Sequence, residues 1–189
     1  GVQVPDALAP VPLTLPTHST LLTGLPPTRH GVRENGMFVL AEDHVTVPEL
    51  LPAGIRAAAF VGAYPVAAQF GLAQGFAVYD DTFPPRTGER VRHQPMRRAA
   101  EVFEPAAAWV AGGETGERPF LWVHAFDPHY PYEAPVPWPR AAAATGGGAY
   151  EAEVAYTDRE LGRFLRSLGA WRGDRAATIV LTADHGESL

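Results

Sequence analysis

Three short apolar runs set the strongest limit on how this chain folds. They are AAAFV at residues 57–61, PFLWVHAF at 119–126 and ATIVLTA at 177–183. Each run has the length of one strand and is apolar on both faces, which is typical of buried strands in a parallel or mixed sheet. Helical patterns lie between the runs, so we predict an α/β fold with helices on both faces of the sheet.

Two longer segments have the composition or spacing of helices. In residues 150–168, the apolar side chains of Val154, Leu161, Leu165 and Leu168 fall on one helical stripe, which ends at Gly169. Residues 97–111 also have helical composition, but Pro105 is expected to kink this helix or to start a new one.

Shorter helices are predicted near the start of the chain. Pro16 suits a first helical turn, and Gly24 suits a left-handed C-terminal cap for the helix THSTLLT. Thr46 and Glu49 have the spacing of a capping box, which predicts a short helix in TVPELLP.

The remaining segments are interpreted as irregular. Residues 1–15 are predicted to be extended and residues 24–36 to form a loop. The polar residues 82–95 are predicted to be a surface excursion, residues 127–139 a proline-rich loop, and residues 140–149 a low-complexity linker.

Length and composition exclude several classes of protein. With 189 residues, 46% of them hydrophobic, the chain suits a single globular domain. The net charge is −6 without a dense basic cluster, which argues against nucleic-acid binding. All 15 basic residues are arginine and cysteine is absent, so lysine and thiol chemistry are excluded. No apolar run reaches the roughly 18 residues that a membrane span needs.

Polar residues follow two of the predicted strands. Asp184 and His185 follow the run 177–183, and the segment from His124 to His129 ends the run 119–126. Ligands in open α/β sheets bind beyond the carboxyl ends of the strands, and Asp oxygen and His nitrogen are ligands for zinc or manganese. The alternative is a capping aspartate beside a solvated histidine, and for His124 a hydrogen-bonded core histidine.

A third polar group lies near the N-terminus. Hydroxyl and imidazole side chains gather around the start of the first predicted helix, at Thr14, Thr17, His18, Ser19 and Thr20. A helix N-terminus has positive potential and unpaired N–H groups, so a hydroxyl there faces a natural oxyanion site. Ordinary N-capping remains the alternative interpretation.

Taken together, these motifs resemble a known family. The stretches LTLPTHSTLLTGLPPTRHGVRENG, GFAVYDD, PFLWVHAFDPHYPY, YEAEVAYTDRELGRFL and VLTADHGESL occur in the order found in the N-terminal domain of sulfatases, in the alkaline phosphatase superfamily. The resemblance implies an alkaline-phosphatase-like, mostly parallel sheet and a divalent metal ion, either zinc, manganese or calcium.

The sequence departs from the sulfatase pattern at the nucleophile. The family motif Cys/Ser-x-Pro-x-Arg falls on residues 14–18, which places Thr14 at the nucleophile and His18 at the arginine. Threonine cannot give the formylglycine aldehyde of sulfatases. The family's anion-binding lysine and histidine fall near Ala63 and Pro65, which lack such groups.

A threonine nucleophile resembles instead the phosphoethanolamine and phosphoglycerol transferases of the superfamily. This resemblance implies that Thr14 is both nucleophile and metal ligand, and that Asp184 and His185 are metal ligands. It implies that His129 contacts the substrate and that His18 assists. The implied substrate is a sulfate or phosphate ester of a small molecule, a lipid or a glycan.

The resemblance also implies a partial domain. The family has a strand with acidic metal ligands before the nucleophile and further strands after GESL, so we expect residues 1–189 to be one partial sulfatase-like domain, inactive alone. Relatives often act outside the cytoplasm, and the compartment stays open. The alternative function is a noncatalytic, degenerate binding or structural module.

Two further polar groups have weaker claims to function. Asp158 falls on the predicted apolar stripe, where we expect it to pair with an arginine. The loop residues His30, Arg33 and Asn35 either approach the site or stabilise turns.

Overall fold

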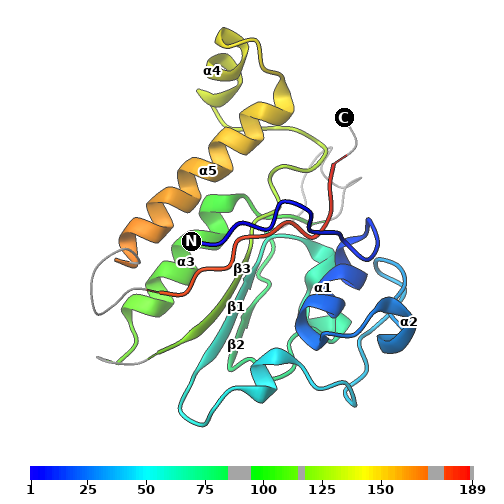
Figure 1. The fold of residues 1–189 in the computed structure, drawn as a ribbon. Helices are drawn as coiled ribbons and strands as arrows, with labels where there is room; N and C mark the ends of the chain where they lie inside the picture. Colours follow the sequence, from blue (N-terminus) through cyan, green and yellow to red (C-terminus); the bar gives the residue numbers. More distant parts are fainter. Residues whose placement is uncertain (85–94, 115–117, 170–176, 188–189) are drawn as a thin grey trace.

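A parallel sheet forms the centre of the molecule. The computed structural model describes residues 1–84, 95–114, 118–169 and 177–187. Within them, β2 (Val78–Asp80), β1 (Ala57–Val61) and β3 (Phe120–His124) form a three-stranded parallel sheet in the order β2-β1-β3 (Figure 1). In the register, Ala59 of β1 lies between Tyr79 of β2 and Trp122 of β3. The predicted α/β class and the first two predicted strands are confirmed.

Helices cover both faces of this sheet. Ala58 and Phe60 of β1 and Val123 of β3 pack against α3 (Ala99–Ala111) and α5 (Ala149–Ser167). Trp122 points to the opposite face, where it packs against the cluster around α1 (Thr14–Thr23). The two helical layers are visible on either side of the sheet in Figure 1. The alternation follows from the period of two along a strand.

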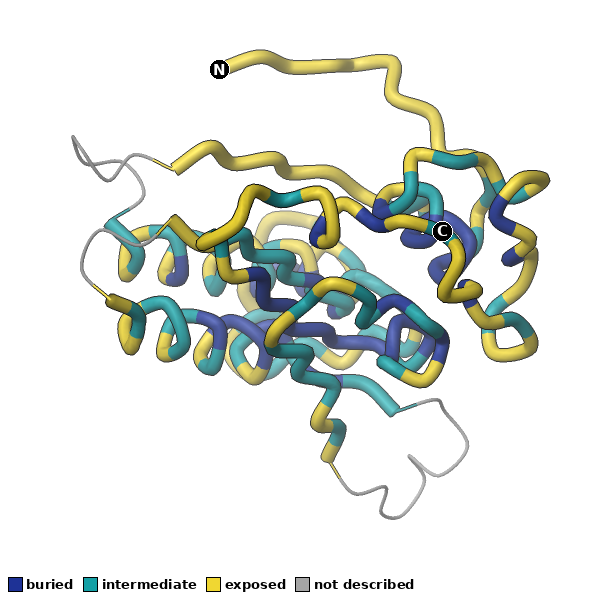
Figure 2. Tube along the Cα trace, turned by 90° about the horizontal axis from the view of Figure 1, so that it is seen from below, coloured by how far each residue is buried: buried dark blue, intermediate teal, exposed yellow. Residues whose placement is uncertain are grey.

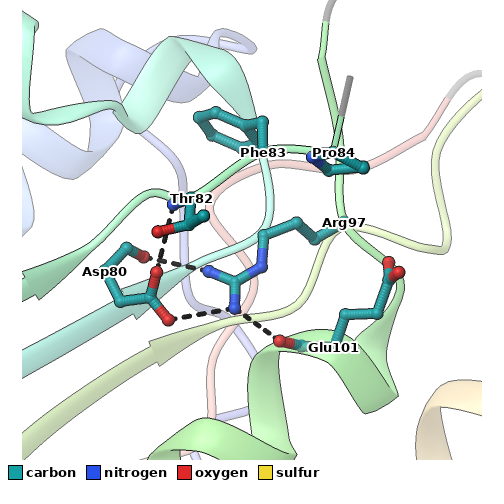
Figure 3. Close-up of a pocket in the computed structure, with 6 residues that line it drawn as sticks. All are labelled: Asp80, Thr82, Phe83, Pro84, Arg97 and Glu101. Atoms are coloured by element: carbon teal, nitrogen blue, oxygen red, sulfur yellow. Dashed lines mark hydrogen bonds and ion pairs between the residues drawn. The ribbon is translucent and has the colours of Figure 1, made fainter. Parts of the chain in front are cut away.

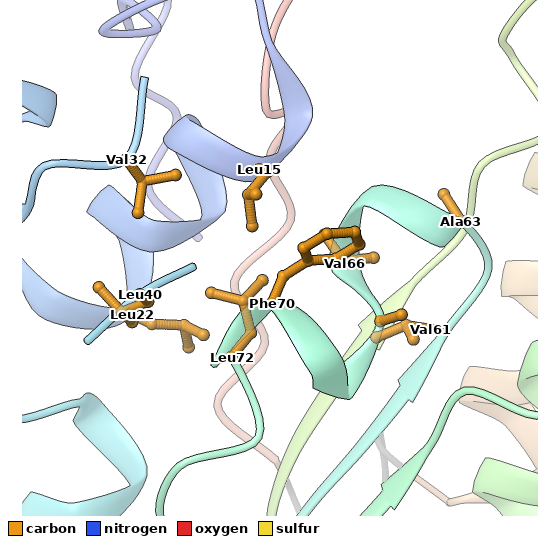
Figure 4. Close-up of a cluster of buried hydrophobic side chains, with 10 residues drawn as sticks. Leu15, Leu22, Val32, Leu40, Val61, Ala63, Val66, Phe70 and Leu72 are labelled. Atoms are coloured by element: carbon orange, nitrogen blue, oxygen red, sulfur yellow. The ribbon is translucent and has the colours of Figure 1, made fainter. Parts of the chain in front are cut away.

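The cluster under α1 is assembled from short segments. Figure 4 shows leucine, valine and phenylalanine side chains converging from α1, the loop after α2 (Pro27–His30), η2 (Tyr64–Val66) and η3 (Ala68–Phe70). Its buried members are Leu15, Leu22, Val32, Leu40, Val61, Ala63, Val66, Ala67, Phe70 and Leu72. Burying this apolar surface holds α1 against the carboxyl ends of the strands.

The start and end of α1 follow rules that the sequence carries. Gly24 adopts φ 69° and its N–H donates to the Thr20 carbonyl, which confirms the predicted left-handed cap. The helix begins at Thr14, two residues before Pro16, so residues 14 and 15 are helical rather than extended. The predicted loop 24–36 contains the single turn α2, which Pro27 starts.

The capping box at Thr46 is confirmed. The Thr46 N–H donates to the Glu49 carboxylate at 2.8 Å, and the segment is a 3₁₀ turn, η1 (Val47–Leu50).

The helices differ from the sequence expectations in three places. Pro105 does not start a new helix, since α3 continues through it while the side chains of Val102, Phe103 and Ala106 pack against the sheet. Part of the predicted linker 140–149 is helical, as α4 (Trp138–Ala144), since alanine is the best helix former.

The face of α5 also differs from the prediction. Leu161, Leu165 and Leu168 pack on the core, but Val154 is exposed. Asp158 is exposed as well, and the buried carboxylate of α5 is Glu153. The buried residues of α5 are Ala152, Glu153, Tyr156 and Phe164. Because Glu153 is charged, the apolar pattern does not mark its position as buried.

The third predicted strand does not form. All residues of 177–183 are exposed and have no strand assignment, and Val180 is 86% exposed (Figure 2). Their β-branched composition favours a strand, but a strand also needs a hydrogen-bonded neighbour. Within the described residues β3 pairs only with β1, and 177–183 does not take its other edge. Most of the predicted excursion 82–95 lies outside the described residues.

Arg97 fastens the end of β2 to the start of α3. Its guanidinium donates to the Asp80 carboxylate at 3.0 Å, to the Asp80 carbonyl at 3.1 Å and to the Glu101 carbonyl (Figure 3). A shallow pocket of about 440 Å³ lies beside it, lined by Asp80, Thr82, Phe83, Pro84, Arg97 and Glu101. Because carboxylate and carbonyls satisfy the arginine, we regard this contact as structural.

Two glycines with positive φ allow a matched test of the packing under α1. A Cβ on Gly71 would lie 2.2 Å from the Leu40 carbonyl oxygen, whereas a Cβ on Gly24 meets nothing within 4 Å. Gly24→Ala should therefore cost about 1–2 kcal/mol, from backbone strain alone. Gly71→Ala should cost clearly more, as measured by denaturant unfolding. Equal losses would contradict the close approach at Leu40.

Candidate active site

The two ends of the chain meet in one site. The Thr14 hydroxyl oxygen lies 3.4 Å from Nε2 of His185, although the two residues are 171 positions apart. Asp184 adjoins the same place, with its Oδ2 3.7 Å from Nδ1 of His18 and 3.4 Å from Nε2 of His185. The structure thus brings Thr14, His18, Asp184 and His185 close together.

The start of α1 positions Thr14. The Thr14 residue is 3% exposed. The Leu15 N–H, which has no partner within the helix, donates to Oδ1 of Asn35 at 2.8 Å. One turn along, Nδ1–H of His18 donates to the Thr14 carbonyl at 2.8 Å. Asn35 of the predicted loop therefore acts by holding the helix end that carries the hydroxyl.

His18 contacts His124, for which the sequence favours a place in the core. Ligand atoms of His18, His124 and Asp184 all lie within 4.8 Å of one another. The rings of His18 and His124 meet edge to face at 4.8 Å between centroids, and Trp122 lies 5.4 Å from His18. His124 ends β3, so it points from the carboxyl edge of the sheet.

His124 is buried, as expected of a core histidine, but the expected hydrogen bond is not present in the described part of the chain. Its Nδ1 is buried and has no hydrogen-bond partner among the described residues. The apolar run around it favoured a core role, because sequence shows the strand but not which neighbours its last side chain meets. Its place at the carboxyl end of a strand was the signal available for a ligand.

Burial keeps the inner histidines neutral. It lowers the pKa of His18, against the opposing attraction of the Asp184 carboxylate. Burial also holds the pKa of His124 well below its usual value, and the neighbouring His18 and His185 act in the same direction. A neutral imidazole keeps a lone pair, which is the form that binds metal ions.

The tautomer of His185 follows from its own contacts. Its Nδ1 lies 2.8 Å from the Gly186 carbonyl, and because a carbonyl only accepts, Nδ1 carries the proton. In the neutral ring Nε2 then has a lone pair, 3.4 Å from the Thr14 hydroxyl. This arrangement allows His185 to accept a proton from Thr14.

His129 lies apart from the cluster. Its ring stacks on Phe126 at 4.3 Å, and Phe126 in turn lies 6.0 Å from His124. Its Nδ1–H donates to the carbonyl of Tyr130 at 2.7 Å. His129 therefore lies in the proline-rich loop, outside the group of His18, His124 and Asp184.

A hydrogen bond joins that loop to the segment after Asp184. The Tyr132 hydroxyl donates to the Glu187 carboxylate at 2.8 Å, and this bond raises the pKa of Tyr132 to about 12. The positions where the family has its anion-binding lysine and histidine hold Ala63 and Pro65, both buried.

The chain belongs to the sulfatase family, whose model matches residues 1–189. A search of curated proteins gave no match.

Solved structures share the fold. The chain is similar to Ps i-CgsB in complex with k-i-k-neocarrahexaose, with a TM-score of 0.65, 16% identity, and coverage of 85% of this chain and 45% of that chain. The phosphonate monoester hydrolase of Agrobacterium radiobacter has a TM-score of 0.59 and 15% identity, with coverage of 86% of this chain and 51% of that chain. BT1596, a 2-O GAG sulfatase, has a TM-score of 0.54 and 17% identity, with coverage of 89% of this chain and 46% of that chain.

These likenesses confirm the alkaline-phosphatase-like fold class. The chain spans about half the length of the solved structures that it matches. None of the helices in the described part of the chain has the length and apolar character that a bilayer crossing requires.

Two of the buried histidines, His30 and His124, give contrasting stability predictions. His30 is fully used, since Val32 N–H donates to its Nδ1 at 3.1 Å and Thr20 contacts its Nε2 at 3.0 Å. In metal-free protein, His124→Phe should raise the free energy of unfolding by about 1 kcal/mol, because an unsatisfied buried nitrogen is removed. His30→Phe should lower it by about 1–3 kcal/mol. Denaturant titration in chelator measures both, and parallel losses would contradict the unsatisfied His124.

Proposed function

We propose that this chain carries the nucleophile centre of a metal-dependent hydrolase or transferase that cleaves a sulfate or phosphate ester, with Thr14 as the nucleophile. The observation that supports this most is the 3.4 Å approach of the Thr14 hydroxyl to Nε2 of His185, beside the cluster of His18, His124 and Asp184. A buried hydroxyl next to a base with a free lone pair is the arrangement that nucleophilic catalysis needs.

The cluster fits a divalent cation. Two imidazoles and one carboxylate offer their ligand atoms within 4.8 Å, and Nδ1 of His124 otherwise has no partner among the described residues. Nitrogen ligands suit zinc or manganese better than calcium, which prefers oxygen. We therefore assign His18, His124 and Asp184 as ligands. The resemblance implies a different set of metal ligands, namely Thr14, Asp184 and His185, and only Asp184 is common to both sets. In the set proposed from the cluster, Thr14 and His185 do not bind the metal ion and take part in the reaction instead.

The side chains then divide the work of the reaction. When bound, a divalent cation lowers the pKa of a nearby hydroxyl and stabilises negative charge on the ester oxygens. The Thr14 oxygen forms a bond to the sulfur or phosphorus, its proton passes to Nε2 of His185, and the bond to the ester oxygen breaks, so that the leaving group departs as an alkoxide and becomes an alcohol when it takes up a proton. The imidazolium formed on His185 lies 3.4 Å from the Asp184 carboxylate, which stabilises its charge.

His129 suits a role at the periphery of the reaction. Because its Nδ1–H already donates to the Tyr130 carbonyl, only a doubly protonated ring also has a proton on Nε2. In that form His129 donates to a nonbridging or leaving oxygen of the ester. His18 assists from within the cluster by holding the Thr14 carbonyl.

The substrate is an ester of a glycan, a lipid or a small molecule. Similar structures include a glycosaminoglycan sulfatase, a protein bound to a carrageenan oligosaccharide and a phosphonate monoester hydrolase, so both glycan sulfates and phosphorus esters are candidates. Thr14 cannot supply formylglycine, which favours a phosphotransferase of the phosphoethanolamine or phosphoglycerol type. Turnover of aryl sulfate, phosphate monoester and phosphodiester substrates, compared with zinc, manganese and calcium, separates these classes.

A noncatalytic module is the second candidate. It is favoured by Ala63 and Pro65, which are buried and offer no side-chain donor where the family grips its anion. Metal binding without turnover on any of these substrates would support it.

Removing the nucleophile gives the sharpest test. In the full-length protein, Thr14→Ala should reduce turnover at least about a thousandfold, because the group that forms the covalent bond is lost. Thr17→Ala is the matched control, since this buried hydroxyl of α1 donates to the Val11 carbonyl at 2.9 Å and lies outside the proposed chemistry. Steady-state kinetics on correctly folded variants decide, and retained turnover in Thr14→Ala would end the nucleophile assignment.

Metal titration tests the ligand assignment independently of turnover. His124→Ala should weaken zinc or manganese binding by roughly 10–100-fold or more, because one of few ligands is lost. His129→Ala should leave the affinity unchanged, since His129 lies outside the cluster. Isothermal titration calorimetry measures both, and equal affinities in the two variants would contradict the assignment of His124.

A further inference from the structure

A second cluster of titratable groups lies on the other side of the sheet. Asp127 follows β3 and is 1% exposed, and Glu153 on α5 is 2% exposed. Neither belongs to the proposed metal cluster or to the proposed reaction. Fully buried carboxylates are rare unless they are paired with a cation or supplied with hydrogen-bond donors.

These carboxylates lack the donors that ionised groups require. Both oxygens of Asp127 and Oε2 of Glu153 are buried without a hydrogen-bond partner among the described residues. Only Oε1 of Glu153 is satisfied, because it accepts the Glu133 N–H at 2.6 Å. An ionised carboxylate has several acceptor sites, whereas a protonated one supplies a donor of its own.

The surrounding charges do not compensate for two negative groups. From α3, the Ala99 N–H and then the charge of Arg98 favour ionised Asp127, but the Ala99 N–H does not reach hydrogen-bond geometry with the carboxylate and the Arg98 guanidinium lies 4.0 Å from the Glu133 carboxylate. From α5, Tyr156 and Glu160 face the same region, and from the loop Glu133 adds another negative charge. Burial, followed by the charge of Glu153, raises the pKa of Asp127 to about 7, and burial also raises that of Glu153.

We propose that Asp127 and Glu153 form a pair that retains a proton in the folded protein and seats residues 125–133 on α5, and that loss of this proton loosens the segment. With the proton present, the pair carries one negative charge and Glu153 holds the Glu133 N–H. Without it, Asp127 is a fully buried charge that lacks a hydrogen-bond donor and is repelled by Glu153, which is unfavourable at low dielectric.

Residues 125–133 also connect to the candidate active site. It contains His129, and through Tyr132 it reaches Glu187 beside Asp184 and His185. The protonation of the proposed pair therefore controls how firmly residues 125–133, which contact Glu187 through Tyr132, are held on α5. It stands apart from the Thr14 chemistry, so it holds or fails whichever reaction the protein performs.

The direction of the pH effect follows from linkage. Asp127 has a higher pKa in the folded state than in the unfolded chain, so the unfolded state releases its proton first as the pH rises. Stability associated with this group is therefore greatest in mild acid and falls between about pH 4 and pH 7.

Asn in place of Asp127 should remove this pH dependence. Between pH 5 and 8, the unfolding equilibrium constant of the wild type should increase at least about tenfold relative to that of Asp127→Asn, when both are measured by denaturant titration in the full-length protein. Glu153→Gln should flatten the profile in the same direction, because the like charge is removed. Asp158→Asn is the control, since this exposed carboxylate lies on the same helix and should give the wild-type profile.

Carbon-detected NMR of the unmodified protein provides a second test that does not depend on the variants folding. One carboxyl resonance, assigned to Asp127 by its absence in Asp127→Asn, should titrate near neutral pH. Amide signals of residues 125–133 should change with the same midpoint. An Asp127 carboxyl that titrates with the exposed carboxylates, or a variant whose stability differs from wild type equally at pH 5 and 8, would overturn the proposal.

Discussion

The contact between His18 and the end of β3 is the interaction on which the site depends. His18 projects from the second turn of α1 and meets the His124 ring, while Trp122 of the same strand lies 5.4 Å from His18 between ring centroids. This packing fixes the helix at the carboxyl edge of the sheet, so that its first residue, Thr14, faces Asp184 and His185. An apolar side chain at position 18 or 124 would hold the helix equally well, but it would leave no nitrogen for a cation or for the Thr14 carbonyl. We infer that the imidazole rings of His18 and His124 both pack α1 against the sheet and supply the nitrogen atoms of the proposed metal site.

The sequence predicted the parts of this fold whose cause is local. The runs 57–61 and 119–126 are apolar on both faces and became β1 and β3, and Gly24 ends α1 because only glycine adopts positive φ easily. The run 177–183 has equally strong strand composition but has no hydrogen-bonded neighbour in the described part of the chain. Composition reports what a segment tolerates, whereas pairing depends on the rest of the sheet.

The candidate site shows the same division. Thr14 and the pair Asp184–His185 were found because motifs mark them, and the structure brings them within contact distance. The sequence left His124 open between a ligand and a core residue and did not mark Glu153, since each lies within an ordinary strand or helix and only its three-dimensional neighbours distinguish it. Asp158 drew attention by its polarity, but α5 turns it to solvent. Buried polar residues are thus poorly predicted from one sequence, because burial is a property of the assembled layers.

The absence of a strand at 177–183 has a consequence for how the site is held together. Without ladder hydrogen bonds, Asp184 is kept near His18 mainly by contacts at its own end of the segment, at the far end of a very long chain loop. A cation shared by these two side chains would act as a reversible cross-link, comparable in principle to a disulfide that closes a large ring. The ion would thereby limit the freedom of the exposed segment 177–183 as well as supply chemistry, and local protease sensitivity near Val180 would become a reporter of metal occupancy.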